Sequence, residues 1–131
     1  MLKQEISILK AIAEDLLELS SGTIDNGSRK PENVAARIGV CNVLLEAGLT
    51  PAIIARYVNK DRSNIYHYQK EHEKYLSDKR INPFYNEFWA DLTKVYNPEK
   101  LPRLWRMAEL NRVKTNITNL QAQKEILLNE L

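Results

Sequence analysis

The sequence predicts an all-α protein, and three features of the 131-residue chain lead to this prediction. Apolar residues recur three and four positions apart along most of the chain, the spacing that places them on one face of a helix. Threonine or asparagine directly precedes proline at residues 50–51, 82–83 and 97–98. Such pairs are typical of helix starts, because the side-chain oxygen caps a free amide and proline suits the first helical position. No segment alternates convincingly like a strand.

The N-terminal helix is expected at residues 2–19, where one apolar stripe contains Leu2, Ile6, Leu9, Ala13 and Leu16. Residues 20–30 follow with two glycines and no periodicity, which is typical of a flexible linker or a long loop. The remaining helices are expected at 31–47, 50–58, 61–79, 83–96 and 98–130.

Two of these helices are joined very tightly. Helix 31–47 ends at Ala47-Gly48, since glycine readily takes the left-handed conformation of a C-terminal cap. Helix 50–58 is short, and only Asn59 and Lys60 separate it from Asp61, a good cap for the next helix. Two closely linked helices, the second with a polar start, are the pattern of a helix-turn-helix.

The expected organisation has a helix-turn-helix at its centre. Its parts are an N-terminal amphipathic helix (1–20), a linker (21–30), the helix-turn-helix domain (31–97) and a long C-terminal helix (98–131) that mediates oligomerisation.

The formal net charge of +2 is unevenly distributed. Residues 1–28 contain two Lys and five acidic residues, and residues 81–131 contain seven basic and six acidic residues. Residues 29–80 contain ten Lys or Arg and six acidic residues. A basic excess in the middle of the chain indicates a polyanionic partner such as nucleic acid, and a solvated surface of mixed charge is the alternative.

Helix 61–79 carries the residues expected to contact DNA. Its core-facing positions are Ile65, Tyr68, His72, Tyr75 and Leu76, so polar side chains occupy the other faces. The first turns of a recognition helix enter the major groove, where Arg62 can bind a guanine edge and Asn64 an adenine edge. Ser63 and the free amides of the helix start can meet a phosphate. Further contacts to the DNA backbone are expected from Arg37, Arg56, Lys60, Tyr66, His67 and Lys70. A capped surface helix with ordinary polar residues is the alternative.

The segment 54–65 (IARYVNKDRSNI) is similar to a motif of a known protein family, and Thr50 lies where that family has a Ser or Thr that opens the preceding helix. Residues 36–76 resemble the C-terminal DNA-binding domain of the bacterial replication initiator DnaA, a Trp-repressor-like helical domain. In that family the corresponding stretch ends in Arg-Asp-His-Ser/Thr-Thr-Val. The resemblance implies that Asp61, Arg62, Ser63 and Asn64 form the turn that contacts bases and phosphates, and Arg37 lies within a residue of an arginine that the family uses on DNA.

Two departures from the family pattern affect function. Arg62 stands where the family has histidine and Asn64 where it has its second threonine, so a different target sequence is expected. The chain contains no GxxxxGK[ST] motif for nucleotide binding, so the protein is not expected to be an initiator.

Other motifs favour a binding protein over an enzyme. No nucleophile elbow, Gly-rich phosphate cradle or paired-carboxylate motif is present. His67 and His72 are five residues apart and Cys41 is the single cysteine, which does not suit a metal site. We therefore expect no metal, no cofactor and no small-molecule substrate. No apolar run approaches the roughly 20 residues of a membrane span. The lone cysteine fits a reducing compartment, so a cytoplasmic location without membrane association is expected.

Two apolar surfaces are predicted beyond the helix-turn-helix. Phe84, Phe88 and Trp89 share a helical face, which is expected to cover the core, with a partner-docking patch as the alternative. The C-terminal helix carries a heptad seam formed by Leu110, Val113, Ile117, Leu120, Lys124, Leu127 and Leu131. This seam favours a homo-oligomer, and packing of the seam against helix 2–19 of the same chain is the alternative.

Two functional hypotheses follow from the sequence. The first is a double-stranded DNA-binding protein that acts in transcription or replication control of a bacterium or a phage. The second is a phage assembly adaptor, or a protein like a terminase small subunit, that reuses a helix-turn-helix scaffold.

Overall fold

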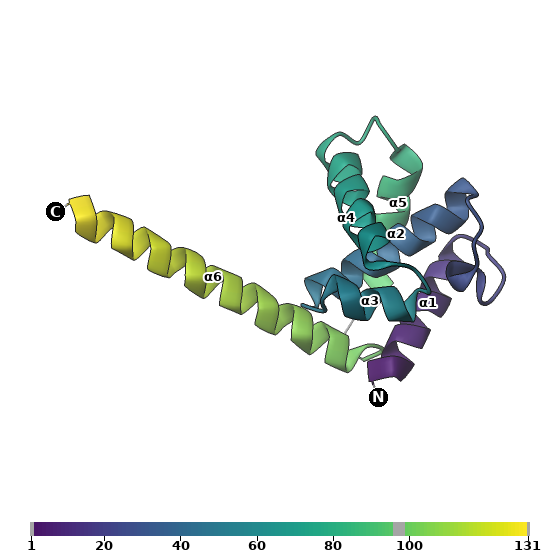
Figure 1. The fold of residues 1–131 in the computed structure, drawn as a ribbon, viewed down its shortest axis with the longest axis horizontal. Helices are drawn as coiled ribbons and strands as arrows, with labels where there is room; N and C mark the ends of the chain where they lie inside the picture. The colour runs from purple at the N-terminus through teal and green to yellow at the C-terminus, as the bar shows by residue number, and fades with distance from the viewer. Residues whose placement is uncertain (1, 96–98, 131) are drawn as a thin grey trace.

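The computed structural model describes residues 2–95 and 99–130, and all regular structure in these ranges is helical. The elements are α1 (Leu2–Leu16), the 3-10 helix η1 (Thr23–Asp25), α2 (Pro31–Glu46), α3 (Pro51–Tyr57), α4 (Arg62–Ser77), α5 (Pro83–Val95) and α6 (Pro102–Glu130). The predicted all-α class is therefore confirmed. Helices α1 to α5 form a compact body from which most of α6 projects (Figure 1). No helix in the described residues is long and apolar enough to cross a membrane.

Helix α2 is the centre of the body. It packs against every other helix and against η1, and residues 35–44 are all buried. A helix that is enclosed on all sides needs apolar or small residues around its circumference, which is the composition found here apart from Arg37 and Asn42, both of which are hydrogen-bonded. At Gly39 the fit is so close that an added Cβ would lie 2.5 Å from the ring of Phe88.

The segment between α1 and α2 is a long loop that packs onto the body. Ile24 in η1 is fully buried, and its amide donates to the buried carboxylate of Glu14 at 3.1 Å. The guanidinium of Arg37, from α2, donates to the backbone oxygens of Ile24, Asn26 and Ser28 at 2.6–2.7 Å. In the structure this segment is held against the body by these buried contacts.

Of the three α5 residues expected to cover the core, Phe88 is buried and Trp89 packs against the core, but Phe84 does not. Tyr85, Phe88 and Leu92 are buried, whereas Phe84 is 43% exposed. The hydroxyl of Tyr85 is hydrogen-bonded to Nδ1 of His72 on α4, and the ring of Trp89 contacts that histidine edge-on. The hydrogen bond to His72 gives a buried tyrosine its polar partner, which the apolar pattern alone does not reveal.

Helix α6 begins at Pro102 and not at residue 98, and the predicted cap at 97–98 lies outside the described residues. Leu101, Leu104 and Ala108 are buried against the body. From residue 112 to residue 130 every side chain of α6 is exposed. The seam therefore does not pack on α1 of the same chain in the described part of the helix, which rules out the intramolecular alternative there; the seam residue Leu131 lies outside the described residues.

Candidate nucleic-acid interface

The connection between α3 and α4 is shaped by backbone hydrogen bonds. Thr50 caps α3 as predicted, since its hydroxyl accepts from the amide of Ile53 at 3.4 Å. After α3, Asn59 takes a left-handed conformation with a φ of 55°, and the amide of Lys60 reaches back to the carbonyl of Ala55 at 3.0 Å. This six-to-one bond around a left-handed residue is a Schellman motif, in which asparagine replaces the more common glycine.

The loop carrying η1 braces this turn from the side. The side-chain amide of Asn59 donates to the backbone carbonyl of Asp25 at 3.3 Å. The ammonium of Lys10 on α1 donates to the carboxylate of Asp25 and to the carbonyl of Tyr57, both at 2.7 Å. These contacts fix the position of the turn relative to α1. They were not predicted from the sequence, where the one local signal was an asparagine just after a short helix, a residue that tolerates the left-handed conformation.

Asp61 stands at the cap position of α4, but not in the expected way. Its backbone is extended and its carbonyl accepts from the amide of Asn64 at 3.0 Å. Its carboxylate, however, accepts no hydrogen bond from the described amides of the first turn. The prediction of a side-chain cap at Asp61 is therefore wrong, and the first turn of α4 keeps amides open to solvent or a ligand.

The predicted division of α4 into a core face and an outer face is confirmed for its central residues. Ile65, Tyr68 and His72 are buried in the body. The residues of the outer face are exposed: Arg62, Ser63, Tyr66, His67 and Lys70. Asn64 is half-buried at the junction with α3.

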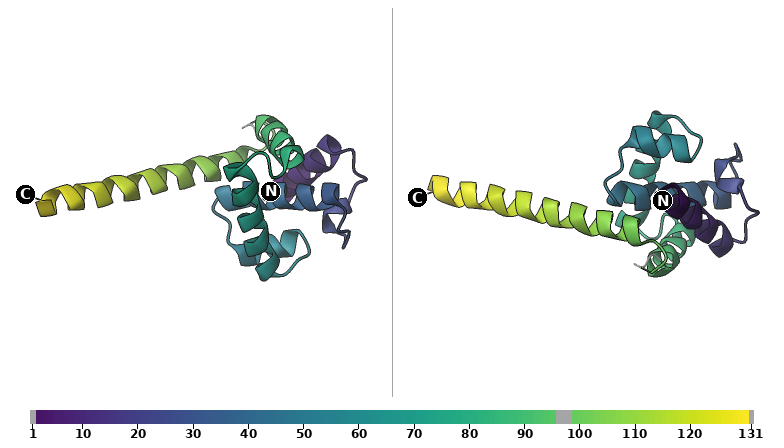
Figure 2. Two further views of the ribbon diagram at one scale, coloured as in Figure 1. Left: turned by 90° about the horizontal axis from the view of Figure 1, so that it is seen from above. Right: turned by 90° about the horizontal axis from the view of Figure 1, so that it is seen from below.

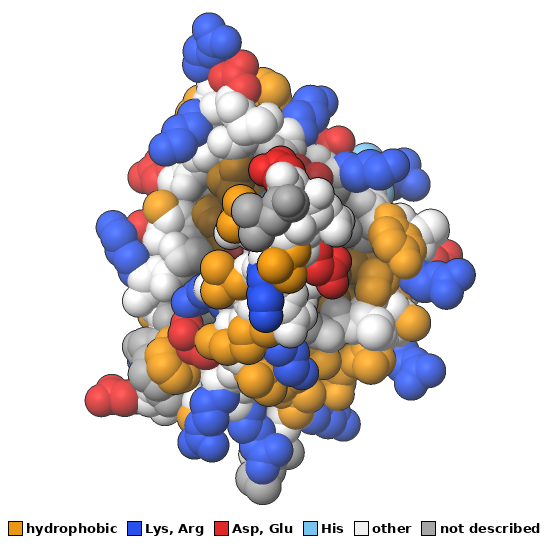
Figure 3. All heavy atoms as spheres, turned by 90° about the vertical axis from the view of Figure 1, so that its left-hand side faces the viewer, with side chains coloured by type: hydrophobic (Ala, Val, Ile, Leu, Met, Phe, Trp, Pro, Cys, Tyr) orange, Lys and Arg blue, Asp and Glu red, His pale blue; other side chains and the backbone are white. Residues whose placement is uncertain are grey.

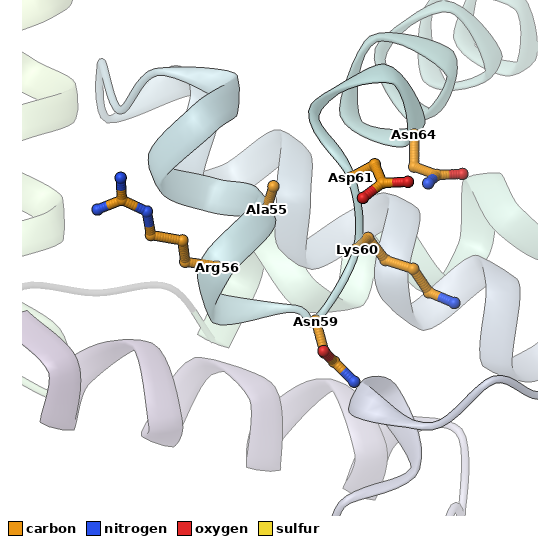
Figure 4. A pocket seen from close by; sticks show the side chains of 6 residues that line it. All are labelled: Ala55, Arg56, Asn59, Lys60, Asp61 and Asn64. Atoms are coloured by element: carbon orange, nitrogen blue, oxygen red, sulfur yellow. The ribbon is translucent and has the colours of Figure 1, made fainter.

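A hollow of about 440 Å³ lies beside the turn, and its lining is polar apart from Ala55 (Figure 4). The lining residues are Ala55, Arg56, Asn59, Lys60, Asp61 and Asn64. The side chain of Arg56 extends away from that of Lys60 in this view. The residues that line the hollow therefore include two cations, a carboxylate and two amides, groups that can hydrogen-bond to phosphates or base edges.

Arg37 does not belong to this surface. It is 2% exposed, and the nitrogens of its guanidinium are engaged by the loop at residues 24–28. A buried guanidinium needs several acceptors because it carries five donors and a permanent charge. This corrects the expectation of a DNA contact at Arg37: its role in the structure is to hold the loop that braces the turn.

His72 and Cys41 are two further titratable groups buried in the core of the described residues. Burial lowers the pKa of His72 from 6.5 to about 4 and raises the pKa of Cys41 to about 12, so both are neutral at neutral pH. Nowhere in the described ranges do three His, Cys, Asp or Glu side chains gather in a way that could hold a metal ion.

Fold and surface together define an all-α, helix-turn-helix-containing body with one projecting helix. No protein-family model, curated protein or solved structure matches this chain. The resemblance of residues 36–76 to the DnaA domain thus stands on the sequence pattern alone.

Proposed function

We propose that this protein binds double-stranded DNA through the helix-turn-helix formed by α3 and α4. The observation that carries the proposal is the exposed first turn of α4. Arg62 and Ser63 are exposed there, and Asn64 and Lys60 line the adjoining hollow. A recognition helix needs this arrangement, because its first turns enter the major groove while its far side stays in the core.

Each residue of this surface has a role that its chemistry supports. Arg62 donates two hydrogen bonds to a guanine edge, and Asn64 pairs with an adenine edge. Ser63 and the open amides of the first turn bind a phosphate. The flanking contacts to the DNA backbone come from Arg56, Lys60, Tyr66, His67 and Lys70, and Asp61 accepts from a cytosine amine.

The charge of the region agrees with a polyanionic ligand. Residues 51–77 contain five Lys or Arg and three acidic residues, and the basic residues Arg56, Arg62, Lys70 and Lys74 are exposed. Phosphate contacts of this kind supply most of the non-specific affinity for DNA and weaken steeply as salt rises. The turn between α3 and α4 is held in place by its contacts with Asp25 and Lys10, so binding costs little conformational entropy there.

The test is fluorescence anisotropy of the full chain with a labelled duplex pool at about 50 and 200 mM salt. We expect affinity to fall by at least tenfold over this range, as counterion release requires. Arg62→Ala should weaken binding severalfold. The matched control is Lys94→Ala, because Lys94 is an exposed cation in the last turn of α5, and α5 lies on the opposite side of the body from α3 (Figure 2).

Base reading is tested separately once a preferred duplex has been selected from the pool. Asn64→Ala should cost about 1–3 kcal/mol on that duplex and little on random sequence. Equal losses on both would show that Asn64 does not read bases. No binding to any duplex at low salt would overturn the proposal and favour the assembly adaptor.

A further inference from the structure

The seam on α6 faces away from the body of its own chain. Leu104 and Ala108 are buried against the body, and the side-chain amide of Asn111 donates to the backbone carbonyl of Glu46 at 3.1 Å. At about 100° per residue, these three positions lie on one side of the helix, and the seam residues from 110 to 127 lie on the other. A second helix can therefore lie along the seam without displacing the body.

The seam is strongly apolar for a surface that faces solvent. Its five hydrophobic members in the described residues are between 50% and 64% exposed: Leu110, Val113, Ile117, Leu120 and Leu127. They occupy a and d positions of successive heptads along a helix of 29 residues, about 43 Å long. Figure 3 views the molecule from the side to which α6 points, and shows hydrophobic side chains gathered around the helix with most Lys and Arg toward the rim.

We infer that α6 pairs with α6 of a second copy of this chain in a parallel, in-register, two-stranded coiled coil. The middle heptad favours two strands, since β-branched Ile117 stands at an a position and Leu120 at a d position, whereas Leu110 and Val113 have the reverse distribution. Lys124, also at an a position, limits the number of strands, because its charge must reach solvent at the edge of a narrow interface.

Charge complementarity sets the direction of the two helices. Glu109 occupies a g position and Lys114 the following e position. In a parallel pair, Glu109 of each copy meets Lys114 of the other, which gives two attractive contacts. In an antiparallel pair with the same seam, Glu109 of one copy meets Glu130 of the other, and like charges oppose association. The parallel arrangement is therefore favoured.

The parallel pairing places both bodies at the same end of the coiled coil. Each body is attached at the first turns of α6, so the two helix-turn-helix units lie near each other and not at opposite ends of the 29-residue helix. The inference itself does not depend on DNA binding. Its test contains no DNA, so its failure is distinct from the failure of the proposed function.

The first experiment is light scattering on the full chain at tens of micromolar, about 10⁻⁵ M. We expect about twice the 15.2 kDa of one chain. Leu120→Glu should give a folded monomer, because Leu120 lies among the exposed residues of α6 and not against the body. Thr118→Glu, at an exposed position outside the seam, is the control and should remain a dimer. A monomeric full chain, or a trimer or larger assembly, would overturn the inference.

The second experiment determines direction by disulfide formation, in which the two Cα atoms are usually about 4.4–6.8 Å apart. Leu127→Cys should form a covalent homodimer under mild oxidation, since d positions face each other in a parallel, in-register pair, whereas in the antiparallel pair Leu127 lies opposite the start of the partner's seam near Leu110. The native Cys41 is buried and its pKa is raised to about 12, so it does not compete. A mixture of Leu110→Cys and Leu127→Cys chains tests the opposite direction. A preferred crosslink between one Leu110→Cys chain and one Leu127→Cys chain, without a Leu127→Cys homodimer, would overturn the parallel arrangement.

Discussion

The carboxylate of Glu5 on α1 accepts hydrogen bonds from the amides of Arg103 and Leu104, at 2.9 and 3.0 Å. These amides belong to the first turn of α6, so a residue near the start of the chain caps a helix near its end. The carboxylate also lies at the positive end of the α6 dipole. Because Leu104 is buried at the same place, the cap and the apolar contact together anchor the projecting helix.

This cap predicts a specific loss of stability. Glu5→Ala should lower the free energy of unfolding by about 1–2 kcal/mol, because two amides near the core lose their acceptor. Chemical unfolding measures the change, and Gln4→Ala, at an exposed position of the same helix, is the control. Amide hydrogen exchange at Arg103 and Leu104 should accelerate in Glu5→Ala alone. Equal stability of the two variants would contradict the role of Glu5.

Arg37 should matter for folding and not for DNA contact. Arg37→Lys should lower the free energy of unfolding by about 2–3 kcal/mol, since an ammonium cannot reach all the loop oxygens that the planar guanidinium binds. Under conditions where the variant remains folded, its affinity for duplex should stay within twofold of the unchanged protein. A large loss of affinity for duplex DNA in a stably folded Arg37→Lys protein would show that Arg37 contributes to DNA binding after all.

The two predicted caps of the helix-turn-helix should behave differently. Thr50→Ala should destabilise by roughly 0.5–2 kcal/mol, because the Thr50 hydroxyl caps the amide of Ile53. Asp61→Ala should change stability by less than about 0.5 kcal/mol, because the carboxylate makes no such bond and is exposed. Thermal unfolding of both variants compares them directly. A larger loss in Asp61→Ala than in Thr50→Ala would show that the sequence-based prediction of a cap at Asp61 was right.

His72 should make the protein sensitive to mild acid. Burial lowers the pKa of His72 to about 4 in the folded state, from 6.5. The unfolded chain therefore binds a proton first as the pH falls, and stability is lost between about pH 6.5 and pH 4. This residue should account for about 2–3 kcal/mol of that loss by pH 4.5.

The check on His72 is chemical unfolding at pH 7.5, 5.5 and 4.5 for the unchanged protein, His72→Gln and His67→Gln. His72→Gln should be less stable at pH 7.5, because its contacts with Tyr85 and Trp89 are altered, but its stability should depend less on pH. His67 is exposed, so His67→Gln should follow the unchanged protein. A pH dependence that persists in His72→Gln would assign the acid sensitivity to other groups.

Local signals in the sequence determined most of the helices and the outer surface of α4. Thr50 caps α3, and Asn82 caps α5 by accepting from the amide of Tyr85 at 3.0 Å. Gly48 takes a φ of 89° where a left-handed cap was predicted. Caps, turns and apolar periodicity depend on residues within one or two helical turns, so they can be recognised without knowing the fold. The exposure of Arg62 and Ser63 follows from the same local pattern.

Tertiary structure decided the roles that depend on residues far apart in the chain. Arg37 has the sequence context of a DNA contact, yet the loop at residues 24–28 surrounds its guanidinium. Glu5 caps a helix that begins almost a hundred residues later. The stripes of α1 and α6 both suit a helix partner, but the body buries α1 and leaves the seam of α6 exposed. The sequence shows that an apolar side chain needs an apolar contact and that a buried charge needs hydrogen-bond or ionic partners. Which residues supply those contacts depends on how the helices pack in space.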